Sequence, residues 1–114
     1  MSATAKRVYF NELAPRWDEM PQPLDASARV AAFCARACPA GARRVLDVGS
    51  GTGVLVAPLL DRLGGAARLV ELDFAHAMLR QAASKTGDAR LLLVCADALA
   101  MPFPPGLFDA VLCF

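Results

Sequence analysis

Short hydrophobic runs alternate along this chain with segments whose apolar residues recur at helical spacing. The runs over residues 43–48, 68–72, 91–96 and 108–114 predict strands. Helical spacing predicts a helix after Asp25, one over residues 55–63, one over 75–84 and one or two short helices within 3–20. Proline and glycine follow most of these segments and predict where each one stops.

The order of the expected elements indicates the fold class. The strands are almost continuously apolar, and helical segments or loops separate them, which is typical of a parallel sheet covered by helices on both faces. We therefore expect an α/β fold with a doubly wound, Rossmann-like parallel sheet. Pro39 and Gly41 end the helix that follows Asp25, so we expect an N-terminal helical cap over residues 1–40 and a sheet-bearing unit over 41–114.

Composition and charge exclude several classes of protein. The 114 residues are 56% hydrophobic, enough for one folded core. Lys plus Arg number 12 and Asp plus Glu 11, so the net charge of +1 is too small to attract nucleic acid or an anionic membrane. No apolar run reaches the ~18 residues of a membrane span, and the N-terminus has no signal-peptide pattern. We expect a cytoplasmic protein with a small-molecule partner.

The four cysteines have no paired short spacing typical of a disulfide scaffold or a zinc ribbon. Cys34 and Cys38 are four residues apart, but no second pair completes a metal site. We expect no metal, and we expect all four thiols, including Cys95 and Cys113, to be buried and reduced.

The strongest chemical signal is the run VLDVGSGTG at residues 45–53. Its three glycines alternate just after a buried strand, where the backbone turns sharply and can approach a ligand closely. A glycine turn alone can be structural, but Asp47 at the strand's end repels a pyrophosphate and attracts a cation. The third glycine follows the second by two residues instead of the three of the dinucleotide fingerprint.

Two further carboxylates fall at expected strand ends. Asp73 ends the second strand, where such folds bind ribose hydroxyls, although it also suits the start of the helix near Ala75. Glu71 lies on the same side of that strand and competes for the ribose role. Asp97 follows the third strand and precedes a loop that can cover a flat ring, but aspartate is also common in turns.

The run at 45–53 resembles the first motif of class I S-adenosylmethionine-dependent methyltransferases, and residues 73–79 resemble the second with Asp73 in register. More weakly, FNELAPRWD at 10–18 resembles the leader of ubiquinone and menaquinone biosynthesis methyltransferases of the type 11 family. The resemblance implies S-adenosylmethionine as cofactor, with Asp73 on the ribose and Asp97 and Ala98 on the adenine. The implied cofactor residues are Asp47, Gly49, Ser50, Gly51, Gly53, Asp73, Phe74, Met78, Asp97 and Ala98.

The resemblance covers the first four strands of the family's seven-stranded sheet, so we expect a methyltransferase fold truncated after strand 4. The substrate-side elements are then missing, and the exposed fourth strand favours self-association. We name no catalytic residue: Asp109 is expected to be structural and His76 to be exposed. The alternatives are a non-catalytic S-adenosylmethionine-binding module that works with a partner and an NAD-type Rossmann oxidoreductase.

Overall fold

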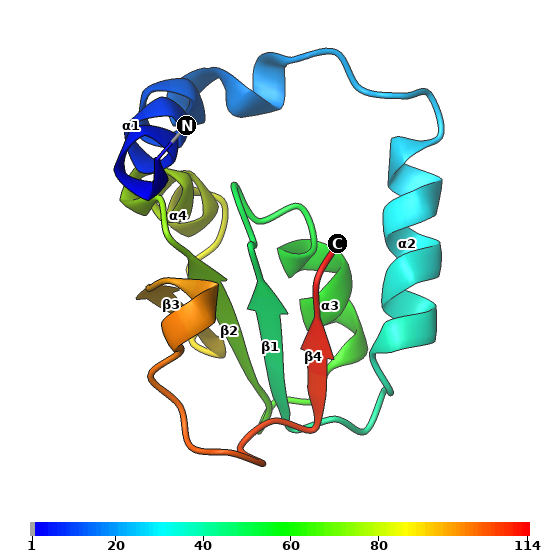
Figure 1. Cartoon of the computed structure of the whole chain (residues 1–114). Helices are drawn as coiled ribbons and strands as arrows, with labels where there is room; N and C mark the ends of the chain where they lie inside the picture. The colour runs from blue at the N-terminus through cyan, green and yellow to red at the C-terminus, as the bar shows by residue number, and fades with distance from the viewer. Residues whose placement is uncertain (1) are drawn as a thin grey trace.

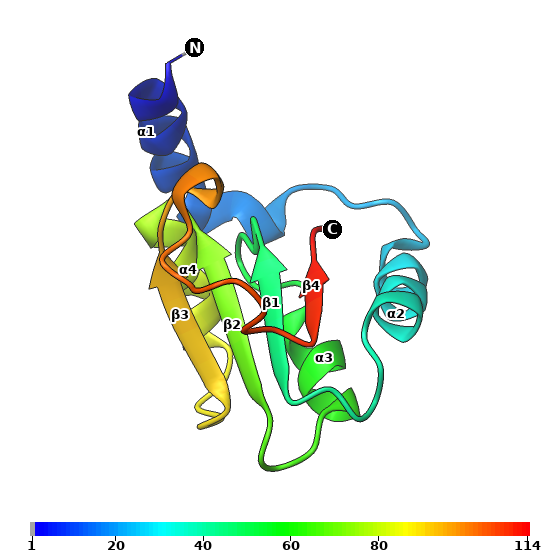
Figure 2. The ribbon, with the colours of Figure 1, turned by 60° about the horizontal axis from the view of Figure 1, so that its bottom comes forward.

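The computed structural model describes residues 2–114 and contains one four-stranded parallel sheet in the order β3-β2-β1-β4. Figures 1 and 2 show the strands side by side, with the helices around them. This arrangement confirms the α/β, Rossmann-like class expected from the sequence. The elements are α1 (Ala3–Leu13), the 3-10 helix η1 (Ala14–Glu19), α2 (Ala26–Ala37), β1 (Arg44–Val48), α3 (Val56–Arg62), β2 (Arg68–Asp73), α4 (His76–Ser84), β3 (Leu91–Cys95), the 3-10 helix η2 (Ala98–Ala100) and β4 (Ala110–Leu112).

Side chains alternate between the two faces of the sheet, and each face has its own core. Val45 and Leu69 face a cluster with Val30 and Cys34 of α2 and Leu59 of α3. On the opposite face, a second cluster contains buried Leu46, Val70 and Leu72 with partly buried side chains around them. Within residues 2–114, no helix contributes to this second cluster; Phe103 and Phe108 from the loop before β4 pack there instead. The expected helical cover therefore lies on one face only.

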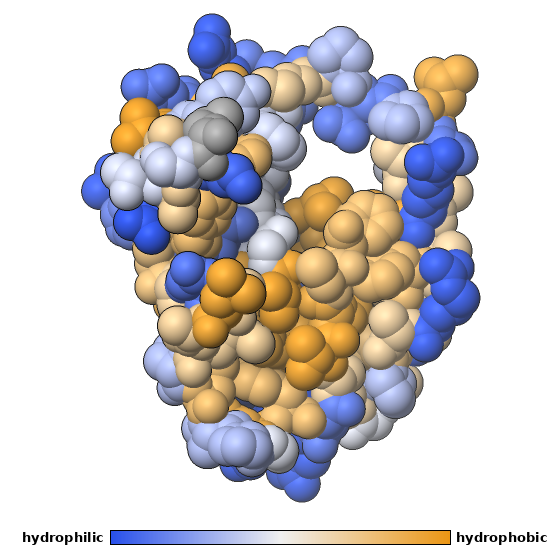
Figure 3. Space-filling model, viewed as in Figure 1, coloured by the Kyte–Doolittle hydropathy of each residue, from blue (hydrophilic) through white to orange (hydrophobic). Residues whose placement is uncertain are grey.

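Hydrophobic side chains are exposed on the face that lacks helices. Leu92, Leu99, Met101 and Val111 are all exposed. Figure 3 shows the hydrophobic surface gathered over the strands and the segment that follows β3. These segments therefore carry more hydrophobic side chains than the described residues cover.

The N-terminal residues form a bridge across the carboxyl end of the sheet. Helix α1 packs beside α4, where the backbone N–H of Ala77 donates to Asn11 Oδ1 at 2.9 Å. Figure 1 shows the chain then passing through η1 to α2, which lies beside β4 at the opposite edge of the sheet. We call residues 14–25 of this bridge the strap. In the described part of the chain, no helix is long and apolar enough to cross a membrane.

Two expectations about the last strand and the cysteines were wrong. The predicted strand 108–114 is shorter, Ala110–Leu112, because Phe108 turns into the loop cluster and Asp109 Oδ2 accepts from the backbone N–H groups of Arg43 and Arg44 at 2.8 and 3.0 Å. Asp109 thus has the structural role expected of it. Cys34 and Cys38 are buried as predicted, but Cys95 and Cys113 are exposed because both lie at the ends of edge strands.

Candidate functional site

The glycine turn between β1 and α3 places three glycines in the left-handed region, with φ of 67°, 59° and 84° at Gly49, Gly51 and Gly53. An added Cβ at Gly49 or Gly51 would meet no atom within 4 Å, so the backbone there faces open space. A Cβ at Gly53 would lie 3.0 Å from Ala82 Cβ and from Val56 Cγ2. The first two glycines leave room for a ligand, whereas Gly53 permits close packing of the turn against α4.

Asp73 fastens this turn to the end of β2. Its Oδ2 accepts from the backbone N–H of Gly51 at 2.9 Å, and its Oδ1 accepts from that of Ala75 at 2.9 Å. The backbone N–H of Ser50 also donates to the carbonyl of Leu72 at 3.0 Å. Asp73 therefore holds both the glycine turn and the start of α4, which is the helix-start role weighed from the sequence. Each oxygen retains a lone pair for a further donor.

Asp47 and Glu71 lie opposite each other on β1 and β2, and both carboxyl groups are buried. Burial and the neighbouring carboxyl raise the pKa of Glu71 to about 11, and burial raises that of Asp47 to about 6. Among the described residues, Asp47 Oδ2, Ser50 Oγ and both Glu71 carboxyl oxygens have no hydrogen-bond partner. Glu71 is fully buried, so it is a poor competitor of Asp73 for a ribose.

The third strand end lies beside the second. The backbone N–H of Ala96 donates to the carbonyl of Asp73 at 3.1 Å, and Asp97 Oδ1 accepts from the backbone N–H of Leu99 at 2.9 Å. Asp97 and Ala98 are exposed where η2 begins. The structure thus places the glycine turn, Asp73 and Asp97 on three neighbouring strand ends, as the sequence predicted.

Phe74 and Met78 pack against the N-terminal bridge. The Phe74 ring packs edge-to-face against Phe10 of α1, with centroids 5.9 Å apart, and the Arg7 guanidinium lies over it at 5.9 Å. Met78 is buried against Ala14 of η1. In the described structure both residues join α4 to the N-terminal bridge. His76 is exposed at the start of α4, as expected.

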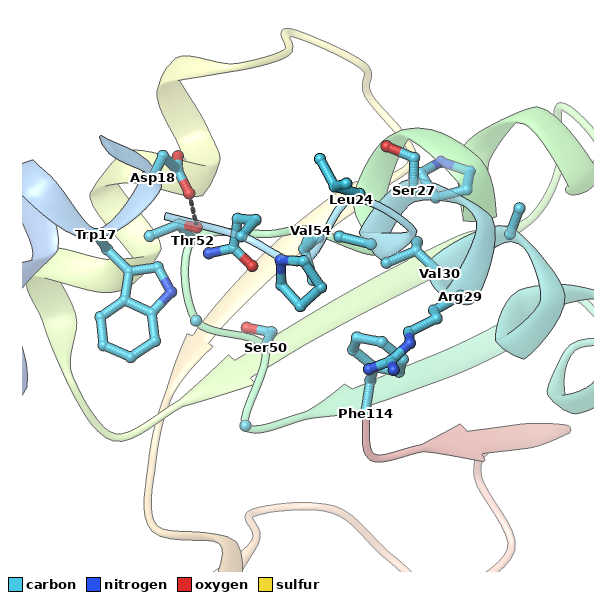
Figure 4. Close-up of a pocket in the computed structure, with 17 residues that line it drawn as sticks. Trp17, Asp18, Leu24, Ser27, Arg29, Val30, Ser50, Thr52, Val54 and Phe114 are labelled. Carbon is cyan, nitrogen blue, oxygen red and sulfur yellow. Dashed lines mark hydrogen bonds between the residues drawn. The ribbon is translucent and has the colours of Figure 1, made fainter. Parts of the chain in front are cut away.

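A cavity of about 760 Å³ opens between the glycine turn, the strap and α2 (Figure 4). On its strap side the cavity is lined by Trp17 and Asp18, which belong to the leader-like segment 10–18. Asp73, Phe74, Met78, Asp97 and Ala98 are not in its wall. Its lining includes Trp17, Asp18, Leu24, Arg29, Val30, Gly49, Ser50, Gly51, Thr52, Val54 and Phe114.

A small polar network joins the strap to the glycine turn. Thr52 Oγ1 donates to Asp18 Oδ1 at 2.6 Å, which Figure 4 shows as a dashed line. Lys85 Nζ contacts Asp18 Oδ2 at 2.8 Å and donates to the carbonyl of Thr52 at 2.6 Å. Partial burial opposes ionisation of Asp18, but the hydrogen bonds from Lys85 and Thr52 prevail and lower its pKa. No sequence motif indicated this contact between η1, the turn and the end of α4.

Comparison with known proteins identifies relatives for most of the chain. Residues 45–114 match the family described as "Methyltransferase domain". Demethylmenaquinone methyltransferase of Thermus thermophilus is 39% identical over 112 residues, covering 90% of this chain and 48% of that protein. Malonyl-[acyl-carrier protein] O-methyltransferase of Geobacter sulfurreducens is 46% identical over 69 residues, covering 60% of this chain and 26% of that protein.

Solved structures show the same fold. Magnesium protoporphyrin IX methyltransferase from Synechocystis PCC 6803, crystallised with bound SAH, superposes with a TM-score of 0.69 at 22% identity. That match covers 96% of this chain and 57% of the other. The chain spans less than half the length of the curated relatives described above.

Proposed function

This chain belongs to the methyltransferase domain family, and on that premise we propose that it binds S-adenosylmethionine at the glycine turn. We further propose that it forms the methyl-donor half of an enzyme that methylates a small-molecule acceptor. One observation carries the proposal: buried polar atoms without partners, Ser50 Oγ and Asp47 Oδ2, accompany a turn whose Gly49 and Gly51 face open space. The bound SAH of the protoporphyrin enzyme and the names of the curated relatives support the same cofactor.

The residues at the strand ends fit the parts of this cofactor. The sulfonium and ammonium groups are cations, and a carboxylate at Asp47 attracts them across a low-dielectric site. The exposed backbone of Gly49 and Gly51 allows the close approach that a side chain would block. We assign the ribose to the free lone pairs of Asp73, and the adenine to Asp97 and Ala98.

Methyl transfer requires little from the protein beyond alignment and a site that excludes water. The cofactor supplies a methyl group already bonded to a cationic leaving group. The chain's own residues orient that group and close the cavity: Asp73 fixes the glycine turn, and Asp18 ties the strap with Trp17 to Thr52. No enzyme nucleophile is needed, and we assign no catalytic residue.

The relatives differ in what they act on, by their names a demethylmenaquinone and a malonyl-[acyl-carrier protein], so they support no single acceptor for this chain. Buried free thiols at Cys34 and Cys38 support a reducing, cytoplasmic location. A non-catalytic S-adenosylmethionine-binding module remains the second candidate, favoured by the bare face of the sheet. An NAD-type oxidoreductase is disfavoured because Asp47 would oppose a pyrophosphate.

Ligand binding is the direct test. Millimolar S-adenosylmethionine or S-adenosylhomocysteine is expected to raise the melting temperature, because a ligand at about 100 times its Kd adds about 2.7 kcal/mol to the unfolding free energy. NAD at the same concentration is expected to leave it unchanged. Differential scanning fluorimetry, with circular dichroism to show that the protein is folded, measures both. A folded protein that responds to neither S-adenosyl compound contradicts the proposal.

We propose that a polypeptide of these 114 residues self-associates through β4 and transfers no methyl group by itself. Strand β4 is an edge of the sheet, with Val111 and Phe114 59% and 60% exposed and no charge after Asp109. Unpaired backbone groups on an apolar edge pair readily with another chain. Size-exclusion chromatography with light scattering is expected to show oligomers, and Val111→Lys to reduce them. A wild-type monomer that methylates a quinol or another small acceptor is the contrary result.

A further inference from the structure

We propose that Glu71 is a positioning residue that shares a proton with Asp47, so that the two carboxyl groups together hold one negative charge beneath the glycine turn. The proposal rests on the proposed function, because that single charge faces the cationic end of S-adenosylmethionine. It assigns Glu71 a role through Asp47, with no direct contact to the cofactor.

The geometry comes from the register of β1 on β2. Asp47 and Glu71 are direct partners across these parallel strands, so their side chains lie next to each other on the same face of the sheet. Asp47 Oδ2 and both Glu71 carboxyl oxygens have no hydrogen-bond partner among the described residues. Glu71 is 0% exposed and Asp47 2% exposed. Two ionised carboxylates repel each other strongly in such a buried site, because no donor among the described residues offsets the repulsion. If one carboxyl keeps its proton, it becomes the donor that the other lacks.

Among residues 2–114, no cation lies beside the pair to replace that proton. Asp73 on β2 adds negative charge. The buried ionisable groups of α2 and of the residue that caps it are the thiols of Cys34 and Cys38. Arg62 of α3 donates both of its hydrogen bonds to the carbonyl of Cys38. The other ionisable side chains of the packed helices are exposed: Arg29 and Arg36 on α2, Asp61 on α3, His76 and Arg80 on α4, and Lys85 at the end of α4, which pairs with Asp18.

The pKa shifts of the two carboxyl groups indicate which of them holds the shared proton. Burial raises both pKa values, that of Glu71 further, so Glu71 keeps its proton at neutral pH and Asp47 carries the charge. Both carboxyls release their protons near pH 4 in the unfolded chain. Above about pH 4 the folded state therefore holds more protons than the unfolded chain. The contribution of these two groups to the free energy of unfolding is fully present below about pH 4 and is lost as the pH rises.

The first experiment uses the unliganded protein. Urea unfolding is measured from pH 5 to pH 8 for wild type and for Glu71→Gln, which keeps the shape and a donor but has no titrating proton. If the folded wild type retains one proton that the variant lacks, the ratio of the wild-type unfolding equilibrium constant to that of the variant rises about tenfold for each pH unit. Glu12→Gln, a change on the exposed face of α1, is the matched control and should follow wild type. Parallel profiles for wild type and Glu71→Gln would overturn the shared proton.

The second experiment measures S-adenosylmethionine affinity by calorimetry at pH 6.5 and pH 8. In Glu71→Ala, Asp47 loses its donor and retains its own proton, so the affinity is expected to fall about tenfold at pH 6.5 and to recover in part at pH 8. Glu71→Gln is expected to restore most of the loss because its amide donates to Asp47. Equal loss in both variants, or a loss in Glu71→Ala that does not change with pH, would overturn the positioning role.

The two experiments separate this inference from the proposed function. If wild type binds no S-adenosyl compound but shows the steeper pH profile, the carboxyl pair stands and the proposed function fails. If wild type binds the cofactor and the two profiles are parallel, the function stands and the role of Glu71 fails.

Discussion

Asp73→Ala is expected to weaken S-adenosylmethionine binding by about 2 to 4 kcal/mol, since it removes a charged acceptor from the ribose hydroxyls. The structure adds a second effect. The same carboxylate accepts from the backbone N–H groups of Gly51 and Ala75, both at 2.9 Å, and is only 7% exposed. Without it two donors at the glycine turn lose their partner, so the unfolding free energy is expected to fall by about 2 to 3 kcal/mol as well.

Urea unfolding of the unliganded protein and calorimetric titration of the folded fraction separate the two effects. Asp73→Asn is the matched control, because its amide oxygen can accept from one of the two backbone groups while its NH₂ opposes the other. We expect intermediate losses for it. Glu71→Ala is expected to cost less affinity than Asp73→Ala; equal losses would mean that the second motif is out of register.

The sequence predicted the parts of the site that depend on local chain geometry. A buried strand followed by alternating glycines indicated the turn, and parallel strands necessarily end at one edge, so Asp47, Asp73 and Asp97 were expected to lie together. The sequence could not show which carboxylate oxygens already accept hydrogen bonds within the protein. Asp73 bonds Gly51 across 22 residues, and neither that contact nor the pairing of Glu71 with Asp47 has a local signal.

Contacts between distant segments account for the remaining differences. Trp17 lines the cavity because Asp18 reaches Thr52 across 34 residues, and the weak leader resemblance was its only sign. Met78 and Phe74, which the resemblance implies as cofactor residues, also pack against the N-terminal bridge, and their cofactor role stays a prediction. The exposure of Cys95 and Cys113 depends on which strands form the sheet edges. Hydrophobic runs do not reveal strand order.

Gly51→Val is expected to lose ligand binding, whereas Gly53→Val is expected to lose stability. At Gly51, φ is 59° and an added Cβ meets no atom within 4 Å, so valine adds about 1 to 3 kcal/mol of backbone strain but no clash. Its side chain would occupy the open space that the ligand needs, and the Kd for S-adenosylmethionine is expected to rise at least ~100-fold, which is about 2.7 kcal/mol. The variant should remain folded.

At Gly53, an added Cβ lies 3.0 Å from both Ala82 Cβ and Val56 Cγ2, and φ is 84°. Valine there combines the same strain with overpacking worth a further ~1 to 3 kcal/mol, so the loss is expected in stability instead of in binding by the folded fraction. Gly65→Val, at a position with ordinary φ and no atom within 4 Å, is the control and should change neither property much. Circular dichroism melts and calorimetric titrations of the three variants measure both effects. If Gly51→Val is folded and binds as wild type does, the open side of the glycine turn is not the cofactor site, because no ligand could contact that backbone past a valine side chain.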